Sequence, residues 1–434
     1  MTGLSNEVAA SDGSLTLRAP DAAILSVVRV AIMTAGSRGD VAPFTGLGHA
    51  LVRAGHEVTL VTHERFEPLV AGSGVGFHPL PVDPRAELES ERGRGLHHSA
   101  SGPGKLLRAV RLARAVVGEL TDDLLAAAHS ADALLAAAPL APLAHTIAEG
   151  LSLPSLGLHL QPIAATREFA PPMLGGGSWG ALANRLAGHG VELAVDRVFA
   201  PVLPSVRARL GLPAKGPRSC RRGPVLHGFS PLMVPRPRDW RPGLDITGYW
   251  WPYDTDRQLP SVLREFLDAG PPPVFVGLGS ATVPDPHRLS GEIVRALRLA
   301  GLRGVIQRGW AGLAADGDDI LTVDEVPHSL LFPETAAVVH HCGAGTTAAG
   351  VRAGVPAVPV PIQFDEGFWA ERLVTAGVAP RTVPLRHLTA EALATALTQA
   401  TGEPRYTARA RELGTRVRAE DGSGRAVEAV ARLA

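Results

Sequence analysis

Short apolar runs alternate with amphipathic stretches along most of the chain. In the first half, apolar runs typical of buried strands occupy residues 27–34, 57–62, 133–138 and 153–160. Pro43 suits the start of an intervening helix and Gly55 suits its end, so this half opens with a strand–helix–strand unit. Helical periodicity returns at residues 106–130. Residues 170–190 contain consecutive glycines and are predicted to form a mobile loop.

The second half repeats the pattern more regularly. Strands are expected at residues 274–278, 304–307, 320–323, 336–340 and 357–360. Helices are expected at residues 261–267, 287–299 and 346–353. Strands separated by helices predict parallel sheets with right-handed crossovers, and hence an α/β fold.

Prolines and tryptophans interrupt the pattern between the two halves. We therefore predict a linker at residues 235–272, between one domain at 25–234 and another at 273–403. A chain of 434 residues exceeds the size at which a single core keeps growing, which agrees with two domains. Residues 1–24 are expected to be a flexible tail. Two parallel sheets in succession leave a cleft between their strand ends, where a ligand can bind.

Composition narrows the classes of function. The 42 basic and 42 acidic residues balance, and the basic ones are dispersed, so no nucleic-acid partner is expected. Cys220 and Cys342 are too few for a disulfide framework and suit a reducing cytoplasm. The N-terminus lacks a signal-peptide pattern, and no apolar run reaches the about 18 residues that span a bilayer. We expect a soluble cytoplasmic protein without stable membrane insertion.

The most informative motif is HHCGAGTT at residues 340–347, between a predicted strand and a predicted helix. Glycines at such a junction allow close approach of a ligand, and a helix N-terminus favours an anion. An imidazole N–H of His341 would add a directed donor, although the two histidines could simply end a buried strand. Ser280, at the end of another strand, is a weaker candidate. The motif predicts a phosphate site at Gly343, Gly345 and Thr346.

An NAD(P)-dependent oxidoreductase is the alternative that these residues allow. Gly343-x-Gly345-x-x-Ala348 matches a dinucleotide fingerprint, and Asp365 stands where a ribose-binding acid would lie. That fingerprint usually opens a cofactor domain, however, whereas this one follows the fourth strand of its domain. An Asp-x-Asp pair at Asp254 and Asp256 lies in the predicted linker, and we predict no metal site there.

Several motifs resemble those of the family 1 nucleotide-sugar glycosyltransferases. The main ones are TAGSRGDVAP at 34–43, FVGLGS at 275–280 and GAGTT at 343–347. Shorter matches are TGYW at 247–250, QRGW at 307–310, FWA at 368–370 and RAEDG at 418–422. The chain looks most similar to the bacterial natural-product and sterol glucosyltransferase branch, over about residues 27–430.

This resemblance implies a GT-B fold, in which two Rossmann-like, doubly wound parallel-sheet domains face each other across a cleft. It implies that the first domain binds the acceptor and the second binds the nucleotide sugar. Helices at residues 404–434 would cross back onto the first domain. The implied enzyme is inverting and metal-independent, has no cofactor beyond its nucleotide-sugar co-substrate, and is a monomer or homodimer.

The resemblance also assigns residues to the donor. His341 would contact the phosphates, and Asp365 and Glu366 would contact sugar hydroxyls. Glu366 departs from the Asp-Gln that most relatives carry, which leaves the identity of the sugar open. Alternatively, Asp365 and Glu366 simply form the acidic N-terminal turn of the helix that holds Trp369. The nucleobase and ribose would lie near Trp310, Val326 and Pro327, although Trp310 could equally be a core residue.

Asp40 occupies the position where many relatives place a catalytic base, which an acceptor hydroxyl requires. The alternative is an acid that only starts a helix near Pro43. Ser37 and Arg38 share its loop, and Arg38 would either reach the phosphates or brace Asp40. His159, at a strand end, would orient Asp40 or be structural.

Acceptor-side residues are expected in the apolar segment at 169–174, including Phe169 and Met173. Such a segment suits a hydrophobic aglycone such as a polyketide, macrolide or sterol, and it also suits a surface loop. UDP and TDP remain equal possibilities for the nucleotide. A non-catalytic helper with the same fold and a sugar 2-epimerase are further alternatives, although neither a base nor a phosphate ligand is missing.

Overall fold

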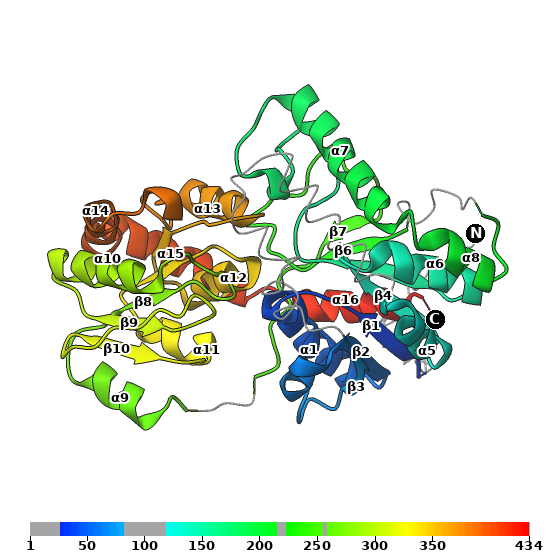
Figure 1. Ribbon diagram of the computed structural model, residues 1–434, viewed down its shortest axis with the longest axis horizontal. Coiled ribbons are helices and arrows are strands. Elements are labelled where there is room, and N and C mark those ends of the chain that lie inside the picture. Colours follow the sequence, from blue (N-terminus) through cyan, green and yellow to red (C-terminus); the bar gives the residue numbers. More distant parts are fainter. Residues whose placement is uncertain (1–26, 82–118, 215–222, 255–257, 434) are drawn as a thin grey trace, which may run out of the picture.

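The computed structural model describes residues 27–81, 119–214, 223–254 and 258–433. The expected tail, residues 106–118 of the helical pattern, Cys220 and Asp256 lie outside these residues. The described chain forms two α/β units, each with a parallel sheet covered by helices (Figure 1). The expected α/β class and two-sheet architecture are confirmed.

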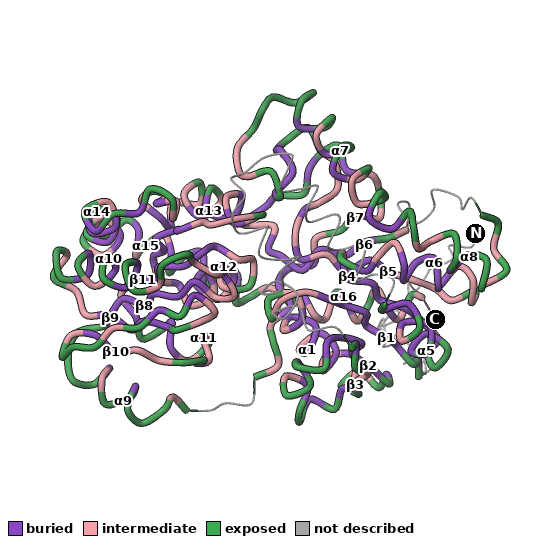
Figure 2. The backbone as a smooth tube through the Cα atoms, viewed as in Figure 1, coloured by how far each residue is buried: buried purple, intermediate pink, exposed green. Residues whose placement is uncertain are grey.

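The first sheet has seven parallel strands in the order β3-β2-β1-β4-β5-β6-β7. They are β1 (Arg29–Met33), β2 (Glu57–His63), β3 (Gly76–Leu80), β4 (Ala133–Ala137), β5 (Ser155–His159), β6 (Val225–His227) and β7 (Leu244–Ile246). In β1, Val30 and Ile32 join one core cluster, whereas Ala31 and Met33 join the cluster on the opposite face. Both faces are therefore buried, as continuous apolar strands predict (Figure 2).

Helices and short 3-10 turns connect these strands. They are α1 (Arg38–Arg53), η1 (Glu64–Leu69), α5 (Thr121–His129), α6 (Ala141–Leu151), η2 (Pro172–Leu174), α7 (Ala181–Phe199) and α8 (Leu203–Arg209). Phe44 and Leu47 of α1 are fully buried against one face of the sheet, and Leu124 and Leu143 of α5 and α6 are buried against the other.

Three local predictions in this half are wrong. The first helix begins at Arg38 rather than near Pro43, because the Ser37 N–H donates to Asp40 Oδ2 at 2.8 Å and caps an earlier turn. The expected loop at 170–190 contains the start of α7, whose glycines hide its periodicity. The expected linker contains β7, which pairs with β6 and so extends the first sheet.

The second sheet has five parallel strands in the order β10-β9-β8-β11-β12. They are β8 (Val274–Gly277), β9 (Gly304–Gln307), β10 (Ile320–Val323), β11 (Ala337–His340) and β12 (Ala357–Pro359). The helices and turns are α9 (Ser261–Asp268), α10 (Pro286–Leu299), α11 (His328–Leu331), η4 (Phe332–Glu334), α12 (Ala344–Ala353), α13 (Glu366–Thr375), η5 (Leu385–His387) and α14 (Ala390–Gly402). All five predicted strands are confirmed.

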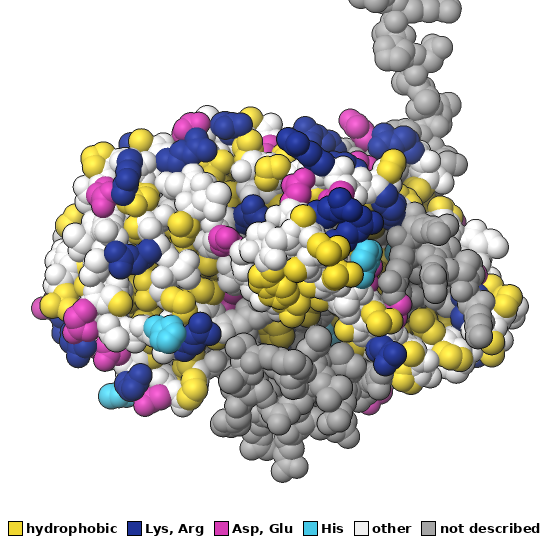
Figure 3. Space-filling view, turned by 90° about the horizontal axis from the view of Figure 1, so that it is seen from above, with side chains coloured by type: hydrophobic (Ala, Val, Ile, Leu, Met, Phe, Trp, Pro, Cys, Tyr) yellow, Lys and Arg dark blue, Asp and Glu magenta, His cyan; other side chains and the backbone are white. Residues whose placement is uncertain are grey.

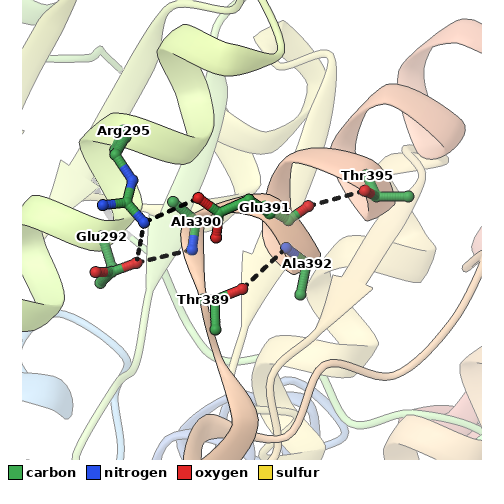
Figure 4. A network of polar contacts seen from close by, with 7 residues as sticks. All are labelled: Glu292, Arg295, Thr389, Ala390, Glu391, Ala392 and Thr395. Atoms are coloured by element: carbon green, nitrogen blue, oxygen red, sulfur yellow. Dashed lines mark hydrogen bonds and ion pairs between the residues drawn. The ribbon is translucent and has the colours of Figure 1, made fainter.

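A polar network joins α10 to the start of α14 on the outside of the second unit (Figure 4). Arg295 pairs with Glu292 at 3.3 Å and with Glu391 at 3.1 Å, and Glu292 accepts the Ala390 N–H at 2.7 Å. Thr389 caps α14 by accepting an N–H at its first turn. These contacts fix the two outer helices and involve none of the predicted site residues.

The chain returns to the first unit at its end. α15 (Pro404–Arg418) packs on α12 of the second unit, whereas α16 (Gly422–Ala431) packs on α1 of the first (Figure 1). Ala426 and Val430 of α16 enter the core cluster of the first sheet. Trp250 Nε1 donates to the Gly422 carbonyl at 3.3 Å, so the two connections between the units contact each other. Of the helices expected to cross back, α16 packs in the core of the first unit, whereas α15 packs mainly on α12.

Candidate active site

Three loops of the second unit converge at the carboxyl ends of β8, β9 and β11. A Cβ on Gly279 would lie 2.6 Å from His341 Cε1, and a Cβ on Gly343 would lie 2.5 Å from His341 Nε2. A Cβ on Gly309 would lie 2.8 Å from the Gly279 carbonyl oxygen. The loops therefore approach this closely only because these positions are glycine, and the imidazole of His341 is held between two of them.

The imidazole of His341 is neutral. Its side chain is buried, and burial lowers its pKa to about 4, an effect that the Gly277 carbonyl opposes. Nδ1 has no partner with good hydrogen-bond geometry. A neutral ring offers one N–H donor and one acceptor rather than a full positive charge.

The N-terminus of α12 follows directly. Gly343 is its N-cap and Ala344 its first residue, so the amides of the first turn, including those of Gly345 and Thr346, have no helical acceptor. Cys342 turns the chain from β11 into α12 with φ +69, a left-handed conformation that is rare outside glycine. Thr347, which the sequence analysis did not select, has a buried hydroxyl without a partner. This end of α12 is suited to bind an anion.

Two more histidines, His340 and His328, lie near His341. His340 accepts the Cys342 N–H at Nδ1, at 3.1 Å, and burial lowers its pKa to about 3. The ring of His328 stacks on Phe332 with centroids 4.3 Å apart, and burial lowers its pKa to about 4, with Arg38 and His341 acting in the same direction. His328 was missed by the sequence analysis, although its place just after Pro327, at the start of a helix, is a usable signal.

Asp40 lies in the first turn of α1, just beyond the end of β1. Its Oδ2 accepts from both the N–H and the Oγ of Ser37, at 2.8 and 3.0 Å. Gly36 has φ +133, and a Cβ there would lie 2.5 Å from Oδ2. Burial raises the pKa of Asp40 to about 6; the bonds from Ser37 oppose this shift, and the charge of Asp365 adds to it. Asp40 is thus a helix cap and also a weak base poised near neutral pH.

Asp365 is the N-cap of α13, in the second unit. Its Oδ2 accepts from Trp369 Nε1 at 2.8 Å. Burial raises the pKa of Asp365, whereas hydrogen bonds from Trp369 and from Gln161 favour its charged form. Gln161 follows β5 of the first unit. Asp365 therefore contacts the first unit and influences Asp40, which brings the predicted base and the predicted sugar ligand together.

Glu366 holds its own loop. Its side chain is buried, and Oε2 accepts from the backbone N–H groups of Ile362 and Gln363, at 2.6 and 2.7 Å. Phe364 in this loop has φ +50, so the bonds from Glu366 support a strained turn. One carboxylate oxygen is therefore engaged within the loop, and the predicted contact between Glu366 and a sugar stays a prediction.

Two arginines of the first unit contact the second. Arg38 forms an ion pair with Glu325, which follows β10. The guanidinium of Arg65 lies 5.3 Å from the ring centroid of Trp310. Arg38 does cross between the units, but its partner there is Glu325, not Asp40.

Two further donor candidates differ in exposure. Ser280 is half-buried in the loop that packs on His341. The side chain of Val326 packs in a core cluster with Phe275 and Phe332. The predicted contact between Val326 and a nucleotide stays a prediction. Pro327 is the N-cap of the short helix α11.

The acceptor-side candidates do not form one group. His159 ends β5 in register with His227 of β6, and their rings meet edge to face with centroids 5.5 Å apart. Burial, followed by the charge of His227, lowers the pKa of His159 well below its ordinary value. Ser37, not His159, orients Asp40. Phe169 is buried against Phe368, whereas Met173 is exposed.

The described ranges contain no group of three His, Cys, Asp or Glu side chains arranged to hold a metal. Asp254, from the possible Asp-x-Asp pair, accepts from Ser329 Oγ at 2.7 Å. Within the same ranges, none of the helices has the length and apolar character needed to cross a membrane.

Sequence comparisons match this chain to known glycosyltransferases. Residues 30–170 match the glycosyltransferase family 28 N-terminal domain, and residues 303–431 match the erythromycin biosynthesis protein CIII-like C-terminal domain. A sterol 3-beta-glucosyltransferase of Arabidopsis thaliana is 32% identical over 424 residues, covering 93% of this chain and 68% of that protein. The O-mycaminosyltylonolide 6-deoxyallosyltransferase of Streptomyces fradiae is 37% identical over 407 residues, covering 91% of this chain and 95% of that enzyme.

The fold has solved counterparts. The crystal structure of the glycosyltransferase VinC in complex with dTDP matches with a TM-score of 0.66 at 24% identity, over 93% of this chain and 99% of that chain. These matches leave the oxidoreductase and non-catalytic helper alternatives without support. The chain therefore belongs to the GT-B glycosyltransferase family that includes the sterol glucosyltransferase and the deoxyallosyltransferase, and it is a glycosyltransferase.

Proposed function

We propose that this enzyme transfers a sugar from a UDP- or TDP-sugar to a hydroxyl of a hydrophobic small molecule, with inversion and without a metal. The observation that carries the proposal is that Asp365 of the second unit lies near enough to Asp40 of the first for its charge to add to the raised pKa of Asp40. A base candidate and a sugar-binding candidate from different units are thereby brought to one place. Inverting transfer needs this arrangement, because the acceptor must attack the anomeric carbon from the side opposite the leaving group.

The leaving diphosphate would bind at the start of α12. Its developing negative charge would be stabilised by the free amides of the first helical turn, the helix dipole and one N–H of neutral His341. These groups are fixed before the reaction by the tight glycine loops. They supply the charge stabilisation that a metal supplies elsewhere, and the dTDP bound to VinC supports a diphosphate ligand for this fold.

Asp40 would accept the proton of the acceptor hydroxyl. As the acceptor oxygen forms its bond to the anomeric carbon, the bond from that carbon to the phosphate oxygen breaks, and the proton moves to the Asp40 carboxylate. A pKa of about 6 leaves Asp40 mostly ionised at pH 7, yet basic enough to take a proton late in bond formation.

A hydrophobic acceptor is supported by exposed apolar side chains. They lie on η2, on α7 and between them: Met173, Leu174, Trp179, Leu182 and Leu186. Figure 3 shows hydrophobic side chains gathered on the face that carries α7. Backbone of the intervening loop packs against the start of α13, since a Cβ on Gly176 would lie 2.7 Å from the Gly367 carbonyl oxygen. The names of two relatives, for a sterol and for O-mycaminosyltylonolide, support an acceptor of this kind.

The test is a matrix of reactions that pairs UDP- and TDP-sugars with sterols and polyketide alcohols, analysed by mass spectrometry. We expect a glycoside with at least one pair, an anomeric configuration opposite to that of the donor, and undiminished yield in EDTA. A retained configuration, or a yield that depends on added Mg²⁺, would refute the mechanism. Absence of any product together with no binding of UDP or TDP would refute the function.

A further inference from the structure

Trp369, in the FWA motif at 368–370, makes a side-chain contact to Asp365. The indole N–H donates to Asp365 Oδ2 at 2.8 Å, from one turn further along α13. This bond engages one carboxylate oxygen and fixes the plane of the group. An N-cap carboxylate would otherwise be free to turn toward the helix amides, but the N-cap side chain here accepts no bond from its own helix.

The indole itself is held rigidly. Trp369 is 1% exposed and lies in a core cluster that draws residues from both units. Its ring meets Phe229 and Phe368 edge to face, with centroids 6.0 and 5.3 Å apart. Phe368 in turn packs on Phe169 of the acceptor-side segment, with centroids 5.3 Å apart. Rotation of the indole would disturb this whole aromatic stack.

We propose that Trp369 is a positioning residue for donor-sugar recognition. Its N–H holds the Asp365 carboxylate in the orientation that binds a sugar hydroxyl, and the aromatic stack keeps that N–H in place. The inference rests on the proposed function of Asp365 as a sugar ligand. It adds that the selectivity for the sugar depends on a residue that does not touch the sugar.

The test compares Trp369→Phe with Trp240→Phe. Trp240 is a matched control, because its indole lies in the same core cluster and donates to a backbone carbonyl, that of Ala164, at 3.4 Å, away from Asp365. The readout is the sugar increment, defined as the ratio of calorimetric Kd values for the nucleoside diphosphate and the matching nucleotide sugar. Thermal melting of each variant reports folding.

Because Trp369→Phe removes one hydrogen bond, we expect it to reduce the sugar increment about five- to tenfold. The Kd for the nucleoside diphosphate should stay within about twofold of the wild-type value. Trp240→Phe should leave both values unchanged. In the Asp365→Ala background, Trp369→Phe should have no further effect, because the side chain that accepts the indole N–H is gone. The donor KM should rise in parallel, with little change in kcat.

Three results would overturn the positioning role. They are an unchanged sugar increment in a folded Trp369→Phe protein, an equal loss in Trp240→Phe, and full additivity with Asp365→Ala. A wild-type protein that gains no affinity from the sugar would overturn it as well. A normal sugar increment without any transfer would instead count against the proposed function alone.

Discussion

Asp40 combines a structural and a chemical property in one side chain. It caps α1 through Ser37, and it is also a buried carboxylate whose pKa is raised to about 6. These properties oppose each other, because the bonds from Ser37 favour the charged form that burial disfavours. Together, burial and the bonds from Ser37 give a carboxylate that is ionised at neutral pH and still basic enough to accept a proton.

The pH dependence of transfer follows from this balance. We expect kcat/KM to fall tenfold per pH unit below about pH 6, as Asp40 becomes protonated. Asp40→Asn should lower kcat about a thousandfold and leave the Kd for the nucleoside diphosphate unchanged. Steady-state kinetics between pH 5 and 8 check both expectations, and a flat acid limb would argue against Asp40 as the base.

The same pKa also predicts a stability effect. A raised pKa means that the folded state binds more protons than the unfolded state between about pH 4 and 6, so wild-type stability is lost as the pH rises through this range. Asparagine does not titrate. The Tm of Asp40→Asn relative to wild type should therefore increase between pH 4.5 and pH 7, as measured by calorimetry. A constant difference would show that Asp40 is not destabilised by burial.

Glu366 tests whether a departure from the family pattern changes specificity. Because its carboxylate accepts two loop N–H groups, the amide oxygen of Glu366→Gln can replace it, and we expect donor preference to be retained. Glu366→Ala leaves those N–H groups without a partner and should raise the donor KM about tenfold. A switch of sugar preference in Glu366→Gln would show that the charge of Glu366 is used on the sugar.

At the scale of elements, the site depends on loops that only glycine can form. Gly343→Ala would place a Cβ 2.5 Å from His341 Nε2, so the imidazole must move, and kcat/KM should fall about a hundredfold. Gly350→Ala is the control on the same helix, because its Cβ would meet nothing within 4 Å. It should keep wild-type kinetics and change stability by less than about 1 kcal/mol. An equal loss of kcat/KM in Gly343→Ala and Gly350→Ala would contradict the claim that Gly343 is required for the position of His341.

The second sheet could be predicted because every strand is a continuous apolar run bounded by turn residues, and each lies at the expected place. The elements that were missed depend on tertiary contacts. Strand β7 has only three residues among prolines and is stabilised by pairing with β6. The start of α1 depends on a cap between Ser37 and Asp40 that overrides the proline signal.

The candidate site was predictable in the same uneven way. Residues next to one another in a motif, such as those from His341 to Thr346, lie together because local geometry places them. Contacts between distant segments carry no signal in a single sequence. The ion pair of Arg38 with Glu325 is of this kind, since it depends on how the two units pack.

At the scale of the molecule, α16 attaches the end of the chain to the first unit. Val430 of this helix is 1% exposed in the first core, whereas Glu428 is exposed. Val430→Asp buries a charge and should reduce the free energy of unfolding by several kcal/mol. Glu428→Ala should change it by less than about 0.5 kcal/mol. Hydrogen exchange should show loosening of β1 and α1 in Val430→Asp, and loosening confined to the second unit would contradict this assignment of α16.

The central claim is that a diphosphate binds at the start of α12 and faces Asp40. A crystal structure with bound UDP or TDP tests it most directly. We predict phosphate oxygens within about 3.2 Å of a His341 ring nitrogen and of the amides of Gly345 and Thr346, with the Asp40 carboxylate across the cleft. A diphosphate that binds away from α12, with His341 uncontacted, would contradict the account.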